Sequence, residues 1–344
     1  MLVGDRFFMR RVLLVILAAM TFFYSGCKSK SEHKKSENSL LIGFSVDNLA
    51  LERWQREVDV FTATARYLGA TVVFKNAEND GGKQESQLYD LLKSDIDVLV
   101  VLPKEASGLS GVLEEYRKKN IPVISYDRLL MNSYASLYIT VDSRKVGEIM
   151  ATQMMNVTES KNWSCILGPE EDYNVPLILD GINSVISGTD IKINDIFYTQ
   201  GWSYENSRKY MIDCVRKNKI PETIICGNDL IAQSVIQVLN DSSQRKHIPI
   251  CGQDADVSAC RNIIEGKQDF TVYKPITNLA ECAANISVRL GRGETMQDLP
   301  YGKEVFNNGL NDVPSVLLDP MLVTKDNMKN VILETGFHSE SDIY

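Results

Sequence analysis

Polar side chains that could bind a ligand follow four short apolar segments of this chain. These strings read FSVDN (44–48), ISYDR (124–128), IICGND (224–229) and PICGQD (249–254). If the apolar parts are strands of an open α/β sheet, their carboxyl ends border the crevice where such sheets bind ligands. Carboxylates, amides and a guanidinium offer paired donors and acceptors, which suit the vicinal hydroxyl groups of a sugar. The pattern therefore indicates a polar pocket for a small, hydroxyl-rich molecule.

Two tryptophans lie near these polar ends. Trp54 follows Arg53 in LERWQ, just after the first strand, and Trp202 lies in QGWSYEN, between a strand and a helix. An aromatic ring can stack on the less polar face of a pyranose. Packing within the core or against a helix remains the alternative role for each tryptophan.

The polar residues at the strand ends also have structural interpretations. Asn228 and Asp254 each precede an expected helix and could be its N-cap. Asp127 and Arg128 could form a surface ion pair, which stabilises a fold little, and Lys274 could be a solvated lysine. The joint placement of these residues at strand ends favours binding.

Catalysis and metal binding are less well supported. A glycosidase would need a carboxylate pair such as Asp127 with Asp254, but the Arg and amide neighbours of these residues suit binding better. The histidines number only three and fall in a tether, a loop and the tail, at His33, His247 and His338. No Cys-x-x-Cys spacing indicates a metal site. We expect no enzyme, no cofactor and no metal.

Short β-rich segments alternate with helical segments from Leu40 onward. Strands are expected at 40–46, 71–77, 97–103, 121–127 and 136–142, and then at 163–169, 191–199, 223–228, 248–254 and 269–275. Helices are expected between them, at 52–68, 84–94, 108–120, 144–156, 176–187, 204–218, 229–240 and 259–265, and later at 277–293. Strands dense in Val and Ile suit a parallel sheet that is buried on both faces. Because the pattern repeats in two halves, we expect an α/β fold with two doubly wound lobes.

The N-terminus resembles an export signal. Three arginines precede an apolar run at 12–24, and Ser-Gly-Cys follows it, as in the lipobox of bacterial lipoproteins. We expect a signal peptide at 1–26, lipidation of Cys27 and a flexible polar tether at 27–39. The folded part would then lie outside the cytoplasm, anchored to the outer face of the cytoplasmic membrane or in the periplasm.

Charge and cysteine content restrict the partners and the redox chemistry. The formal net charge of −8 argues against a nucleic-acid partner. Six cysteines follow Cys27, and three of them lie inside expected strands. We expect buried free thiols, with one disulfide as the alternative.

The strings DNLALERWQ, SYDR, GND, GQDAD and TVYKPIT, in this order and spacing, resemble the bacterial D-xylose-binding proteins. These are sugar-binding components of ABC importers in the type I periplasmic (ribose/galactose-binding) superfamily. The resemblance runs from about residue 40 to 337. It implies two lobes joined by three crossings, near 141–142, 272–274 and 309–316. The lobes would comprise 40–142 with about 274–308, and 143–273 with about 309–337.

The resemblance also implies which residues contact the sugar. They are Asp47, Arg53, Trp54, Asp127, Arg128, Asp172, Asn174, Trp202, Asn228, Asp254 and Lys274. The family usually shows an Asp-Asn-Asn-Ala run in the second lobe, whereas this chain has DYNVP at 172–176. This difference bears on the choice of sugar.

The function implied is a lipid-anchored receptor that closes on a monosaccharide, D-xylose or a related aldose, and delivers it to an ABC permease. A sugar sensor that signals to a histidine kinase or chemoreceptor in the membrane is the alternative. A repressor on the same fold would need a DNA-binding headpiece, where this chain shows a signal and a tether.

Overall fold

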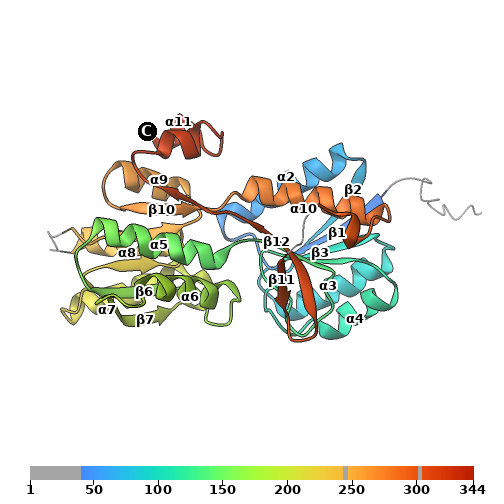
Figure 1. Ribbon diagram of the computed structural model, residues 1–344, viewed down its shortest axis with the longest axis horizontal. Helices are drawn as coiled ribbons and strands as arrows, with labels where there is room; N and C mark the ends of the chain where they lie inside the picture. The colour runs from blue at the N-terminus through green and yellow to red at the C-terminus, as the bar shows by residue number, and fades with distance from the viewer. Residues whose placement is uncertain (1–39, 243–246, 301–303) are drawn as a thin grey trace, which may run out of the picture. The chain divides into compact units, whose positions relative to one another are not determined.

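The computed structural model describes residues 40–242, 247–300 and 304–344. The expected signal peptide, lipidated Cys27 and tether lie outside these residues. Leu40–Tyr344 forms one compact unit that contains two sheets with helices on their faces (Figure 1). Within the described ranges, none of the helices has both the length and the apolar composition needed to cross a bilayer.

The first sheet has seven strands in the order β11-β12-β5-β4-β3-β1-β2, all parallel to their neighbours except β11. The strands are β1 Leu40–Val46, β2 Ala70–Asn76, β3 Val98–Val101, β4 Val123–Tyr126, β5 Leu137–Val141, β11 Glu304–Asn307 and β12 Asp312–Leu318. Helices α2 (Glu52–Tyr67) and α10 (Ile276–Gly291) cover one face, while α3 (Gly81–Lys93) and α4 (Ser110–Lys118) cover the other.

The two-sided core of this sheet follows from the alternation of side chains along a strand. In β3, Val98 and Val100 pack with α2 and α10, whereas Leu99 and Val101 pack with α3 and α4. All four side chains are fully buried. This explains why the strand is apolar without interruption.

The second sheet has six strands in the order β13-β10-β9-β8-β6-β7, and only β13 is antiparallel to its neighbour. The strands are β6 Asn162–Leu167, β7 Lys192–Tyr198, β8 Ile224–Cys226, β9 Ile250–Gln253, β10 Phe270–Tyr273 and β13 Met321–Val323. The helices are α5 Ser143–Val157, α6 Asn174–Ile186, α7 Tyr204–Arg216, α8 Asp229–Asp241 and α9 Val257–Ile264. Helices α5 and α6 pack on one face, and α7 and α8 pack on the other.

The C-terminal segment belongs to the second half of the unit. A π-helical turn at Lys329–Leu333 and the short helix α11 (Glu340–Ile343) follow β13. Their apolar side chains pack with those of α9 and β10. The segment thus reaches the end of β10, close to the polar strand ends identified from the sequence.

The chain passes three times between the two sheets. It leaves the first sheet after Val141, returns after Tyr273 and leaves again after Leu318. The first and third crossings lie side by side, because the Asp142 amide donates to the Leu318 carbonyl at 3.0 Å.

The predicted doubly wound α/β architecture is confirmed, and all ten expected strands are present. Three further strands, β11 to β13, lie beyond the expected ones. We expected residues from about 309 onward in the second lobe, but β12 pairs with β5 in the first sheet, so the third crossing lies further along the chain. The six described cysteines are free thiols, and Cys165, Cys226, Cys251 and Cys260 are buried.

Candidate functional site

The carboxyl ends of both sheets meet at one small, polar cavity. It is lined by Leu51, Arg53, Trp54, Asp127, Arg128, Asp172, Asn174, Trp202, Asn228, Gln253, Asp254 and Lys274. Its volume is about 20 Å³, close to the space that one water molecule needs. The side chains from the two sheets therefore contact one another directly.

Arg53 is the cation at the centre of the cavity. It lies in the first turn of α2, where β1 ends, and only 5% of its surface is exposed. Its Nη2 donates to Asp127 Oδ2 at 2.8 Å, and its Nη1 lies 3.5 Å from Asp254 Oδ1 on the opposite sheet. The guanidinium also lies over the Trp54 ring, 4.2 Å from the ring centroid. One side chain thus joins the two walls.

Glu57 supports Arg53 from one helical turn further along α2. Arg53 Nε donates to Glu57 Oε1 at 2.6 Å, and the Tyr126 hydroxyl donates to Glu57 Oε2. Burial raises the pKa of Glu57 to about 7, although the charge of Arg53 opposes this rise. The orientation of Arg53 is therefore fixed by a carboxyl group that titrates near neutral pH.

Asp127 and Arg128 follow β4 directly. The Asp127 backbone is left-handed (φ 62°), and its carbonyl accepts from Tyr138 Oη and Thr140 Oγ1 at 3.1 and 2.8 Å. Burial disfavours the ionised carboxylate, but Arg53, Lys274 and Arg128 together hold the pKa of Asp127 below its ordinary value. This carboxylate is therefore ionised and faces the cavity.

Asp47 supports Arg128 as Glu57 supports Arg53. Arg128 Nη1 donates to Asp47 Oδ2 at 2.6 Å and to the Pro103 carbonyl at 3.0 Å. On its other side, Nε lies 2.8 Å from Asp172 Oδ2 of the second sheet. This approach is an ion pair without hydrogen-bond geometry, because Nε has no hydrogen-bond partner.

Trp202 closes the second-sheet side of the cavity. Its indole Nε1 donates to Asp172 Oδ2 at 3.0 Å. The ring lies against Gly168 and Gly227, which follow β6 and β8, and a Cβ at Gly168 would overlap the indole carbons. Two glycines at strand ends thus make room for the aromatic ring.

Hydrogen bonds and an ion pair hold the other second-sheet residues of the lining. Asn228 is the N-cap of α8, since its Oδ1 accepts from the Ile231 amide at 2.9 Å. Asn174 Nδ2 donates to Asp127 Oδ1 at 3.1 Å, another contact between the two walls. Lys274 Nζ lies 3.4 Å from Asp254 Oδ1.

Several buried polar atoms of the lining have no hydrogen bond. Among the described residues, seven buried side-chain polar atoms lack a hydrogen bond, and four of these lie on cavity-lining residues. They are Trp54 Nε1, Arg128 Nε, Asn174 Oδ1 and Gln253 Oε1. Buried polar groups are rarely left unsatisfied. Arg128 Nε still has its ion pair with Asp172, so the Trp54 donor and the two amide acceptors are the atoms that indicate a polar ligand.

Comparison with known proteins identifies the family. Residues 42–295 match the family described as periplasmic binding protein domain. The chain belongs to this family. It is 35% identical to the D-xylose-binding periplasmic protein of Haemophilus influenzae, over 97% of this chain and 99% of that one. It is 36% identical to the Escherichia coli protein of the same description, over 88% and 92% of the two chains.

A solved structure agrees with this membership. An ABC transporter solute-binding protein from Clostridium phytofermentans, with bound β-D-glucose, has a TM-score of 0.81 and 26% identity, and the match covers 88% of this chain and all of that one. The predicted type I periplasmic binding protein fold is confirmed, as is the prediction of a binding protein rather than an enzyme. In the described ranges, no three His, Cys, Asp or Glu side chains are grouped as a metal site.

The structure brings ten of the eleven expected contact residues to one cavity. The exception is Asp47, which lies behind Arg128 and binds it. Trp54 lines the cavity, but Arg53 lies over its ring. Sequence reasoning missed Gln253 and Glu57, although Gln253 ends the strand in PICGQD and Glu57 lies four residues after Arg53. Leu51 carries no signal, because an apolar residue before a helix is common.

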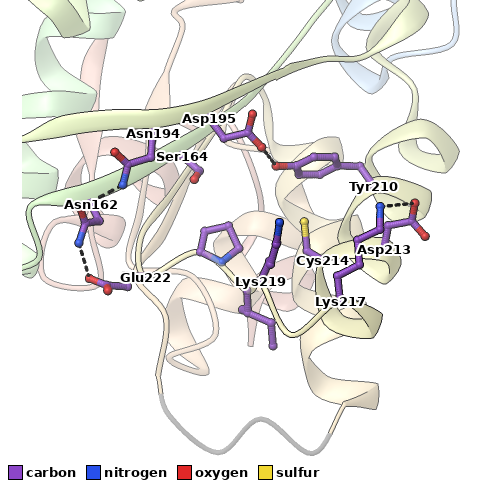
Figure 2. A pocket seen from close by; sticks show the side chains of 12 residues that line it. Asn162, Ser164, Asn194, Asp195, Tyr210, Asp213, Cys214, Lys217, Lys219 and Glu222 are labelled. Carbon is purple, nitrogen blue, oxygen red and sulfur yellow. Dashed lines mark hydrogen bonds and ion pairs between the residues drawn. The ribbon is translucent and has the colours of Figure 1, made fainter.

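A larger cavity lies at the other end of the second sheet (Figure 2). Its volume is about 670 Å³, and it is bordered by the amino ends of β6 and β7, the last turns of α7 and the segment 219–222. The Tyr210 hydroxyl donates to Asp195, and Lys217 Nζ lies 3.7 Å from Asp213 Oδ2. Most of the charged side chains at this outer cavity are exposed.

Proposed function

We propose that this protein is an extracytoplasmic, lipid-anchored binding protein for a monosaccharide, D-xylose or a related aldose, which it delivers to an ABC importer. Two relatives that match nearly the whole chain are described as D-xylose-binding periplasmic proteins. The lipobox-like Ser-Gly-Cys sequence supports an anchor at Cys27. The observation that carries the proposal is the set of four buried polar atoms without a hydrogen bond, which lie among paired charges on two facing walls.

Binding requires the two walls to separate and close again. A cavity of about 20 Å³ cannot hold a pentose, so the sugar enters when contacts such as Arg53–Asp254 and Asn174–Asp127 open. Its hydroxyl groups then replace these direct contacts. The ligand favours the closed arrangement only through interactions with both walls. The three crossings serve as the hinge.

A sugar-sensing receptor is the second candidate. The chain is 24% identical to a multiple sugar-binding periplasmic receptor of Rhizobium radiobacter, over 88% of this chain and 92% of that one. The two candidates share the binding site and differ in the membrane partner. Co-purification with a permease or with a membrane kinase distinguishes them.

A panel of sugars tests the ligand. We expect D-xylose, added at 100 times its dissociation constant, to raise the melting temperature of the Leu40–Tyr344 unit by roughly 5 °C. Calorimetry should give micromolar affinity, or about −8 kcal/mol. A shift with another aldose and none with xylose would refute the choice of sugar. If no monosaccharide binds, the proposed function is wrong.

A further inference from the structure

The turn that carries Asp254 has an unusual backbone. Asp254 and Ala255 both have positive φ angles, 99° and 57°. Such conformations are unfavourable for residues other than glycine and persist only where the surroundings hold them. The carboxylate of Asp254 faces Arg53 and Lys274 from this turn. The contacts that hold residues 254–256 therefore decide where this carboxylate lies.

Asp229 holds the turn from the sheet side. Its side chain is fully buried, and its Oδ2 accepts from the Asp256 amide at 3.1 Å. Thr271 Oγ1 and Gln268 Nε2 donate to the same carboxyl group, both at 2.9 Å. A Cβ at Gly252 would overlap Asp229 Oδ1, so a glycine in β9 makes room for it.

The chemistry of Asp229 suggests a positional role. Its three hydrogen-bond partners are neutral groups, and burial, followed by the charge of Asp254, raises its pKa above the ordinary range. Burying a carboxyl group without a cation beside it costs free energy, which its hydrogen bonds must offset. The hydrogen bond from the Asp256 amide to Asp229 explains why a carboxyl group is retained at this buried position.

His338 holds the same turn from the opposite side. It lies in the C-terminal segment, 4% exposed, and its Nε2 is 2.7 Å from the Ala255 carbonyl. Because a carbonyl only accepts, Nε2 must donate. The neighbouring Phe337 packs on Tyr273, and Arg56 of α2 donates from Nη1 to the Phe337 carbonyl at 2.7 Å. The segment is thereby tied to the helix that also carries Arg53.

We propose that Asp229 and His338 are positioning residues that clamp the 254–256 turn and so aim Asp254 at the ligand. This inference rests on the proposed function. Asp229 fixes the amide of Asp256, His338 fixes the carbonyl of Ala255, and the Asp254 amide donates to the Val272 carbonyl at 2.9 Å. The C-terminal segment is then part of the binding apparatus, although it does not line the cavity.

Hydrogen exchange of the Asp256 amide tests the clamp without sugar. We expect Asp229→Ala and His338→Ala each to speed this exchange about tenfold, as the loss of one hydrogen bond allows. His338→Gln keeps a side-chain donor and should restore protection. Glu340→Gln, an exposed change in the same segment, is the matched control and should have no effect. Unchanged exchange in both alanine variants would overturn the proposal.

A double-mutant cycle tests whether the clamp acts through Asp254. We expect His338→Ala to weaken xylose binding about tenfold in the wild type. In an Asp254→Ala background, His338→Ala should lower the xylose affinity less than about twofold, because no carboxylate remains for the turn to position. Equal losses in the two backgrounds would overturn the proposal. If no aldose binds the wild type, the proposed function fails, while the exchange of Asp256 still decides the clamp.

Discussion

The second sheet has a cavity at each end of its strands. The larger cavity has exposed charged side chains, whereas the smaller one has buried charged side chains. The outer cavity is about 670 Å³, and exposed side chains provide most of its charge. The cavity at the carboxyl ends is about 20 Å³, yet its charged side chains are more than nine-tenths buried. What marks the smaller cavity as a site is the convergence of buried polar groups.

The energetic cost of burial explains this contrast. Removing a charged group from water destabilises a protein by several kcal/mol unless a partner compensates it. Arg53 and Arg128 are compensated by Glu57 and Asp47 behind them. Exposed pairs such as Lys217–Asp213 cost little and contribute little. Buried, paired charges that converge on a cavity therefore mark a candidate functional site.

Removing Arg53 should have the largest effect. Arg53→Ala leaves Glu57, Asp127 and Asp254 without the cation that they share. We expect sugar binding to be lost in calorimetry and the free energy of unfolding to fall by about 3 kcal/mol in urea denaturation. Lys217→Ala at the outer cavity is the matched control. Wild-type affinity in Arg53→Ala would show that buried charge does not mark the site.

Displacing Trp202 should have a smaller effect. A Cβ in Gly168→Ala overlaps the indole and pushes it from its place. We expect sugar affinity to fall roughly three- to tenfold, as the loss of an aromatic contact allows. Gly111→Ala in α4, where a Cβ meets nothing within 4 Å, should leave the affinity unchanged. If Gly168→Ala binds as well as the wild type, the ring does not contribute.

Glu57 should make the stability of the protein depend on pH. Its pKa, about 7 when folded, lies above the ordinary value of 4.5, so the folded state binds a proton that the unfolded state releases. The stabilisation from this proton is complete below pH 4.5 and is lost as the pH rises through 7. We expect this fall in wild-type urea denaturation between pH 5 and 8, and a shallower one in Glu57→Gln. Parallel profiles would contradict the assignment.

Changes at the outer cavity should have the smallest effect. We expect the double variant Lys217→Ala and Lys219→Ala to change sugar affinity less than about twofold and stability by at most about 0.5 kcal/mol. Calorimetry and urea denaturation measure both. A larger loss of affinity would mean that the two ends of the sheet are coupled. The outer cavity would then contribute to sugar binding.

Local chemistry makes much of the fold and of the site predictable. Apolar segments rich in Val and Ile indicated buried parallel strands, and the polar residues after them indicated which end binds. The sequence could not decide where 313–324 belongs, because a short apolar segment pairs with either sheet equally well. Its two parts enter different sheets as β12 and β13.

The sequence also could not predict which side chains line the cavity and which lie behind or over one another. Asp47 and Asp127 both follow strands, yet one lies behind Arg128 and the other lines the cavity. Likewise, Trp54 was expected to contact a sugar face, but Arg53 lies over its ring. Distances between elements far apart in the chain decide such roles, and spacing along the chain does not encode them.

The three crossings have a consequence for how the chain folds. Ser315 pairs with Tyr138, so the first sheet is completed by a strand from near the end of the chain. A nascent chain cannot finish this sheet until β12 has been synthesised. Pairings between distant segments also form slowly. The topology therefore delays completion of the first sheet until nearly the whole chain is available.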